Sequence, residues 1–76
     1  MVKPTQIINQ IRNLRFAADE MTQGELADRI DVTRQTVNAI EQGKYSPSLE
    51  VAFKISRVFG VALEDVFQYP DQQQSR

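Results

Sequence analysis

The chain has 76 residues, which is enough for one small domain. It contains no cysteine and no histidine, so disulfides, thiolate metal sites and histidine-based acid–base catalysis are excluded. No apolar run approaches the roughly 20 residues that a membrane-spanning helix needs. The first residues also lack the apolar stretch of a signal peptide. We therefore expect a cytoplasmic protein without a metal, a cofactor or an evident small-molecule ligand.

The formal net charge is only −1, but the charges are unevenly distributed along the chain. The segment 17–32 has one basic residue, Arg29, against the acidic residues Asp19, Glu20, Glu25, Asp28 and Asp31. The segment 33–60 has the acidic residues Glu41 and Glu50 against the basic residues Arg34, Lys44, Lys54 and Arg57. If the chain binds a polyanion, the second segment must provide the contact surface.

The first predicted element is a helix over residues 5–18. Ile7, Ile11, Leu14 and Ala18 recur at helical spacing and form one apolar stripe. Pro4 is well placed at the entry to this helix.

A second helix is predicted to begin after Thr22. Thr22 and Glu25 have the spacing of a capping box, in which each side chain accepts a hydrogen bond from the other residue's backbone N–H. Met21 lies just before the cap and Leu26 just after the first turn, which are the two positions of a hydrophobic staple. The inward-facing residues are predicted to be Leu26, Ala27 and Ile30.

A third helix is predicted to begin after Thr33, the expected N-cap. Val37 and Ile40 are its inward pair, and Gly43 ends it, as glycine commonly does just past a helix.

A fourth helix is predicted over residues 49–59, capped by Ser48 and ended by Gly60. A short fifth helix follows at 63–67. Because no strand-like alternation is visible, the fold class is predicted to be all-α, with five short helices. The predicted inner stripe of the fourth helix is Leu49, Ala52, Phe53, Ser56 and Phe59, with Ile55 at its edge.

The second and third helices are separated by three residues only, Asp31 to Thr33, which forces a sharp corner. The helices can cross closely because Ala27 is small. The outer side of the third helix is left polar, with Arg34, Gln35, Asn38, Glu41 and Gln42.

This arrangement of residues resembles that of a known family, and the resemblance is specific. The segment 23–42, QGELADRIDVTRQTVNAIEQ, resembles the helix-turn-helix of the phage repressor and Cro family, also called the XRE family. The resemblance covers residues 11–69 and implies a lambda-repressor-like DNA-binding domain over residues 1–69, followed by a polar tail at 70–76. Two departures are Asp31, where the family usually has a left-handed glycine, and a link at 19–21 that is one residue longer than usual.

The resemblance implies that the third helix enters the major groove of double-stranded DNA. Base contacts are then expected from Arg34, Gln35, Thr36 and Asn38, because guanidinium, amide and hydroxyl groups match the edges of bases. Phosphate contacts are expected from Gln23, Thr33, Lys44 and Tyr45. For each of these residues, a merely solvated or packed side chain is the alternative.

Two further expectations concern structure. Arg15 and Glu41 are expected to form an ion pair between the first and third helices, as in related repressors, although Glu41 could instead be exposed. One reading helix covers few base pairs, so a homodimer binding two operator half-sites is expected. Val66, Phe67 and Tyr69 are the predicted dimer contacts, or alternatively they complete the core.

The sequence favours a sequence-specific transcriptional regulator, and a repressor is the simplest expectation. The alternative is a helix-turn-helix module that binds proteins, such as an antitoxin or the partner of a regulator. An enzyme has almost no support, because no nucleophile–base pair, metal-ligand spacing or phosphate loop is present in the sequence.

Overall fold

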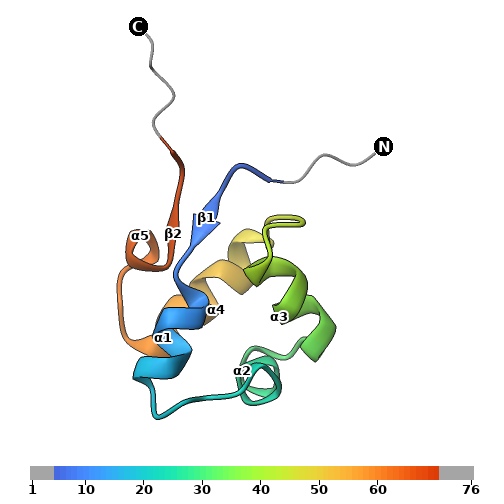
Figure 1. Cartoon of the computed structure of the whole chain (residues 1–76), viewed down its shortest axis with the longest axis vertical. Helices are drawn as coiled ribbons and strands as arrows, with labels where there is room; N and C mark the ends of the chain where they lie inside the picture. Colours follow the sequence, from blue (N-terminus) through green and yellow to red (C-terminus); the bar gives the residue numbers. More distant parts are fainter. Residues whose placement is uncertain (1–4, 71–76) are drawn as a thin grey trace, which may run out of the picture.

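The computed structural model describes residues 5–70, and within them five helices and one pair of short strands form the fold (Figure 1). None of these helices has the length and apolar character required to cross a membrane. The elements in chain order are β1 (Ile8–Asn9), α1 (Ile11–Ala17), α2 (Gln23–Ile30), α3 (Arg34–Glu41), α4 (Leu49–Phe59), α5 (Leu63–Val66) and β2 (Phe67–Gln68). The predicted tail lies outside the described residues from position 71 onward.

Every helix contributes to a single hydrophobic core. Burying one large aliphatic side chain stabilises the fold by about 1.5–3 kcal/mol, so a core this small depends on each of its members. The buried apolar residues are Ile11, Met21, Leu26, Ala27, Ile30, Val37, Ile40, Ala52, Ile55 and Val66. The inward residues predicted for α2 and α3 are all in this set.

The start of α2, and the corner between α2 and α3, form as the capping residues predict. The Thr22 side chain accepts from the backbone N–H of Glu25, and the Glu25 carboxylate accepts from the N–H of Thr22. Thr33 caps α3 by accepting from the N–H of Thr36. Between the helices, Asp31 takes the left-handed conformation with φ 66°. The chain therefore turns at the position where the family usually has glycine.

The start of α1 differs from the prediction: the helix begins at Ile11, not at residue 5. The side chain of Asn9 accepts from the N–H of Ile11 at 3.2 Å, and its amide donates to the carbonyl of Ile40 at 3.0 Å. Asn9 thus holds an extended segment against the end of α3. Ile7 lies in this segment, outside α1, and does not extend the stripe of the helix.

The strand pair was not predicted. β1 and β2 are antiparallel, with Ile8 opposite Gln68 and Asn9 opposite Phe67 (Figure 1). The N–H of Gln10 also donates to the carbonyl of Val66 at 2.8 Å. The five-helix fold is confirmed, and the all-α description needs this addition. The pairing joins the two ends of the described chain on the side opposite α2.

The inner face of α4 is rotated from the predicted one. Ile55, placed at the edge by the sequence, is in the centre of the core, while Leu49 and Phe53 are 68% and 47% exposed. Ala52 and Ser56 are buried, and Phe59 packs partly against the core. Leu49 and Phe53 were therefore wrong as core residues, because the helix presents apolar side chains around most of its circumference.

The long link between α1 and α2 contains two left-handed residues in succession. Asp19 and Glu20 have φ values of 62° and 57°. The backbone then returns to the helix, since the N–H of Met21 donates to the carbonyl of Arg15 at 2.9 Å. The longer link thus forms a tight turn that closes against the end of α1 before α2 begins.

Candidate nucleic-acid interface

The first turn of α3 presents two exposed side chains, Arg34 and Gln35. Neither has a hydrogen-bond or ion-pair partner within residues 5–70. The stem of Arg34 passes over the start of α2, where its Cδ lies 3.8 Å from the position that a Cβ on Gly24 would take. A guanidinium and an amide are therefore available at the N-terminal end of a helix fixed by the corner.

Thr33 and Thr36 share a contact at the same end of α3. Their hydroxyl oxygens lie 2.9 Å apart, and the oxygen of Thr33 also accepts from the backbone N–H of Thr36. Thr33 is exposed and Thr36 is half-buried. Both hydroxyl groups therefore have a partner within the protein, and the side chain of Thr33 is the more exposed of the two.

An ion pair between Arg15 and Glu41 connects α1 to the end of α3. The Arg15 Nε donates to Glu41 Oε2 at 2.6 Å, and its second terminal nitrogen donates to Oε1 at 3.1 Å. The remaining terminal nitrogen donates to the carbonyl of Met21 at 2.8 Å. Both charged side chains are only 9% exposed. This bidentate pair fixes the position of α3 relative to α1 and to the start of α2.

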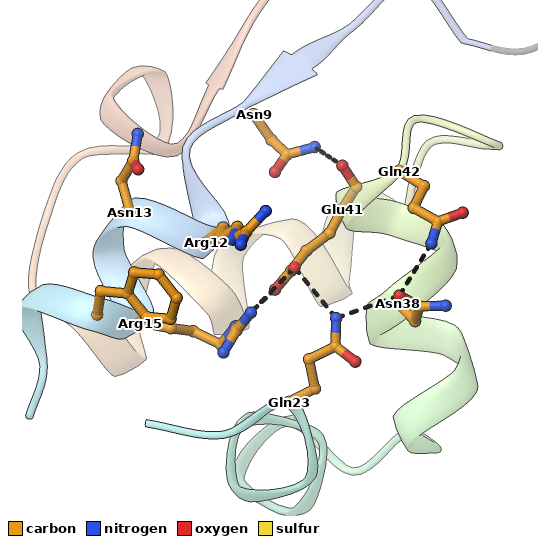
Figure 2. A pocket seen from close by; sticks show the side chains of 9 residues that line it. Asn9, Arg12, Asn13, Arg15, Gln23, Asn38, Glu41 and Gln42 are labelled. Carbon is orange, nitrogen blue, oxygen red and sulfur yellow. Dashed lines mark hydrogen bonds and ion pairs between the residues drawn. The ribbon is translucent and has the colours of Figure 1, made fainter. Parts of the chain in front are cut away.

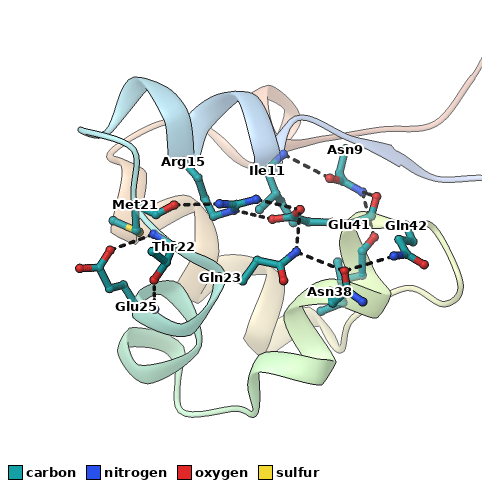
Figure 3. A network of polar contacts seen from close by, with 11 residues as sticks. Asn9, Ile11, Arg15, Met21, Thr22, Gln23, Glu25, Asn38, Glu41 and Gln42 are labelled. Carbon is teal, nitrogen blue, oxygen red and sulfur yellow. Dashed lines mark hydrogen bonds and ion pairs between the residues drawn. The ribbon is translucent and has the colours of Figure 1, made fainter.

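A chain of amides extends from this ion pair to the outer face of α3 (Figure 3). The Gln23 amide nitrogen donates to Glu41 Oε1 at 3.1 Å and to Asn38 Oδ1 at 3.2 Å. The Gln42 amide nitrogen donates to the same oxygen of Asn38, also at 3.2 Å. The side chain of Gln23 is therefore occupied within the protein. Its two amide protons are not free for the phosphate contact that the sequence suggested.

A polar hollow of about 580 Å³ lies between α1, α3 and the start of α2 (Figure 2). Its lining consists of Asn9, Arg12, Asn13, Arg15, Phe16, Gln23, Asn38, Glu41 and Gln42. The predicted base-contact residue Asn38 and the ion pair thus share one surface.

Arg12 is a member of this hollow that sequence reasoning missed. It is exposed, has no acidic partner within residues 5–70, and its guanidinium carbon lies 5.5 Å from the centre of the Phe16 ring. The available signal was its spacing, because Arg12 precedes Arg15 by three residues and the two therefore project from similar sides of a helix. Arg12 adds a positive charge beside the outer face of α3.

Lys44 and Tyr45, the other predicted phosphate contacts, follow α3 in the loop before α4. Both are exposed, Tyr45 at 41%. They lie next to Gly43, whose φ of 72° ends the helix. The loop therefore places a cation and a phenol close to the C-terminal end of α3.

One of the three predicted dimer contacts is contradicted. Val66 has no exposed surface and belongs to the core, so it is not available to a second chain. Phe67 is half-buried and lines an apolar hollow of about 290 Å³, while Tyr69 is 68% exposed.

Within residues 5–70 no group of three potential ligands gathers as a metal site.

Two helices joined by a three-residue turn, the second with a free polar face, define a helix-turn-helix domain. The family model described as helix-turn-helix matches residues 10–66, and the chain belongs to this family.

The relatives agree with this assignment. An uncharacterized HTH-type transcriptional regulator of Methanocaldococcus jannaschii is 49% identical over 65 residues, 86% of this chain and 97% of the relative. The transcriptional repressor RstR of the cryptic phage CTXphi, from Vibrio cholerae, is 36% identical over 58 residues, 76% of this chain and 51% of RstR.

A crystal structure from Bacteroides fragilis has the same fold. It has a TM-score of 0.70 at 21% identity, covering 82% of this chain and 98% of that one.

Proposed function

We propose that the chain is a transcriptional repressor that binds operator DNA with α3 in the major groove. The observation that carries this proposal is the free polar side of α3, where Arg34 and Gln35 have no partner within residues 5–70. An arginine fork matches O6 and N7 of guanine, and a glutamine amide matches N6 and N7 of adenine. The phage repressor among the relatives supports repression as the outcome.

Phosphate contacts would place the domain on the duplex. The backbone N–H groups of Gln23 and Gly24 open α2, where they have no acceptor within the helix and attract anions. Arg12, which lines the hollow beside α3, and Lys44, which follows the end of α3, add exposed positive charges. Thr33 and Tyr45 offer hydroxyl donors at the two ends of the same helix. This arrangement would allow a chain of net charge −1 to bind a polyanion, because Glu41, the acidic residue of α3, is already paired with Arg15.

Specific recognition would use a homodimer with one α3 in each half-site. The surface for the second copy is the apolar hollow lined by Ile7, Leu49, Leu63 and Phe67, because its apolar walls lose contact with water on association. Tyr69 follows β2 and adds an exposed aromatic ring close by. The proposed assembly acts in the cytoplasm, without catalysis and without a small-molecule ligand.

The test is selection of bound duplexes from a random pool, followed by titration of the enriched duplex at several salt concentrations. We expect one enriched sequence with two-fold symmetry, and an affinity that falls steeply with salt because bound cations are released from DNA.

Arg34→Ala should weaken binding of the enriched duplex. Arg57→Ala removes the same charge from the exposed side of α4 and serves as the control. If no duplex is enriched, or if both variants lose the same affinity, the proposal is wrong and a protein-binding module becomes the better reading.

A further inference from the structure

We propose that Asn38 reads the major groove as a hydrogen-bond donor only. It would contact acceptor atoms, such as O6 and N7 of guanine or O4 of thymine, and would not form the paired contact with N6 and N7 of adenine. This inference rests on the proposed function and specifies the chemistry of one contact within it. It also revises the sequence-based expectation, in which the Asn38 amide offered a donor and an acceptor together.

The orientation of the amides follows from Glu41. A carboxylate can only accept hydrogen bonds, so the Gln23 atom that lies 3.1 Å from Glu41 Oε1 must be the amide nitrogen. The carboxylate itself cannot turn away, because Arg15 holds both of its oxygens in a site that is 9% exposed. The ion pair therefore fixes which end of the Gln23 amide faces α3.

The second proton of Gln23 then sets the orientation of Asn38. The Gln23 amide nitrogen lies 3.2 Å from one terminal atom of Asn38, and that atom must be an acceptor, Oδ1. The same oxygen accepts from the Gln42 amide nitrogen at 3.2 Å. A carbonyl oxygen has two lone pairs, so two donors fill its capacity.

The other end of the Asn38 amide is free. Its nitrogen has no hydrogen-bond partner within residues 5–70, and it points away from both Gln23 and Gln42 (Figure 3). Asn38 lies one helical turn after Arg34, which places it on the same side of α3. The Asn38 side chain therefore offers a ligand on this side two N–H donors and no available acceptor.

The chemistry of the bases determines which base atoms Asn38 can contact in this orientation. In the major groove adenine presents N6 as a donor beside N7 as an acceptor, and cytosine presents N4 as a donor. Guanine O6, thymine O4 and the purine N7 atoms are acceptors. An amide whose oxygen is filled gains nothing from the exocyclic amino groups. Asn38 should therefore distinguish one base pair from another through their acceptor atoms alone.

The test is a set of double-mutant cycles between Asn38→Ala and single-atom changes in the enriched duplex. Acceptors are removed with 7-deazapurines, with 2-aminopurine in place of guanine, or with a pyrimidine lacking O4. Amino groups are removed by replacing adenine with purine nucleoside or cytosine with its 4-deamino analogue. At one position in each half-site, removal of an acceptor should lower the affinity of the wild-type chain about tenfold. The same removal should not lower the affinity of Asn38→Ala any further, because the variant has already lost that contact. Removal of amino groups should show no coupling to Asn38 at any position.

Two variants alter the hydrogen-bonding capacity of Asn38 without removing its side chain. Asn38→Asp places an acceptor where the nitrogen was, so the coupling should move to the amino groups. The double variant Gln23→Ala/Gln42→Ala frees Oδ1, so coupling to amino groups should appear beside coupling to acceptors. Thermal unfolding of each variant checks that the domain is folded.

The outcomes separate this inference from the proposed function. An enriched duplex whose amino groups couple to wild-type Asn38 would overturn the donor-only assignment and leave the repressor proposal intact. A uniform loss in Asn38→Ala without coupling to any base atom would also overturn it, because it would mean a phosphate contact or a purely structural role. If no duplex is enriched, the proposed function fails, and this inference fails with it.

Discussion

Replacing Glu41 with alanine should destabilise the domain strongly. The substitution leaves the Arg15 guanidinium buried, with the carbonyl of Met21 as its remaining hydrogen-bond partner and the centre of the Phe16 ring 5.6 Å from its central carbon. Removing one member of a buried ion pair costs about 3–5 kcal/mol, because the other charge stays out of water without its counter-charge. The pair in this chain meets that condition, since both side chains are 9% exposed and the contact is bidentate.

The loss is large relative to the total stability. At about 0.05–0.15 kcal/mol per residue, a chain of 76 residues has a free energy of unfolding of roughly 4–11 kcal/mol. A loss of about 3 kcal/mol should lower the melting temperature by about 12 °C or more in a domain of this size. Part of the population could then be unfolded at physiological temperature, and the apparent DNA affinity would fall with it.

Urea and thermal unfolding of Glu41→Ala measure this loss directly. The matched control is Arg15→Met/Glu41→Leu, which replaces both charges with apolar groups of similar volume. This double variant should recover most of the stability, because buried ion pairs often contribute little beyond an apolar pair. It should not recover base discrimination by Asn38, because Gln23 has lost the carboxylate that orients it. A loss below about 1 kcal/mol in Glu41→Ala would refute the reasoning, since that is the range of exposed pairs.

Four other substitutions have expected outcomes. Asp31→Gly should raise the melting temperature by several degrees, because a non-glycine residue at φ 66° carries about 1 kcal/mol of strain and a carboxylate is unfavourable at a helix C-terminus; an unchanged value would contradict this. Gly24→Ala should stabilise α2 by about 0.4–1 kcal/mol in urea, because the added methyl meets only ordinary contacts at 3.8 Å. Gly60→Ala should destabilise the domain despite open space, because φ is 67°, and equal effects at both glycines would count against the argument. Arg34→Ala should cost about 1–3 kcal/mol in binding at one position of each half-site without altering the melting temperature.

The parts of the fold that were predictable depend on local chemistry. Thr22, Thr33 and Ser48 each accept a backbone hydrogen bond three residues ahead, so the starts of α2, α3 and α4 could be placed from the sequence. Gly43 and Gly60 end helices through their left-handed conformation. These interactions join residues that are close in the chain, and their spacing is therefore visible in it.

The parts that were not predictable depend on contacts between distant residues. α1 begins late because Asn9 bonds to Ile40, thirty-one positions away, and because β1 pairs with β2 at the far end of the domain. The helical stripe that includes Ile7 is real as a pattern, but tertiary pairing overrides it. On α4, apolar side chains point in several directions, so periodicity could not distinguish Ile55 as core from Phe53 as surface.

The candidate site shows the same division. The residue types on α3 were evident, since Arg34, Gln35 and Asn38 stand at the spacing of one helix face. Their hydrogen-bonding state was not evident, because it depends on Gln23 of α2 and Glu41 at the end of α3 meeting in space. The position of Arg12 was not evident either, because the apolar stripe of α1 indicates only how that helix packs and not that it lies beside α3.

Insertion of α3 into the major groove is tested most directly by guanine methylation protection on the enriched duplex. Dimethyl sulfate methylates guanine N7, an atom on the floor of the major groove. We predict that the wild-type chain protects guanines symmetrically in both half-sites and that Arg34→Ala loses protection at one of them. Protection of the duplex backbone with every guanine N7 still reactive would contradict the account.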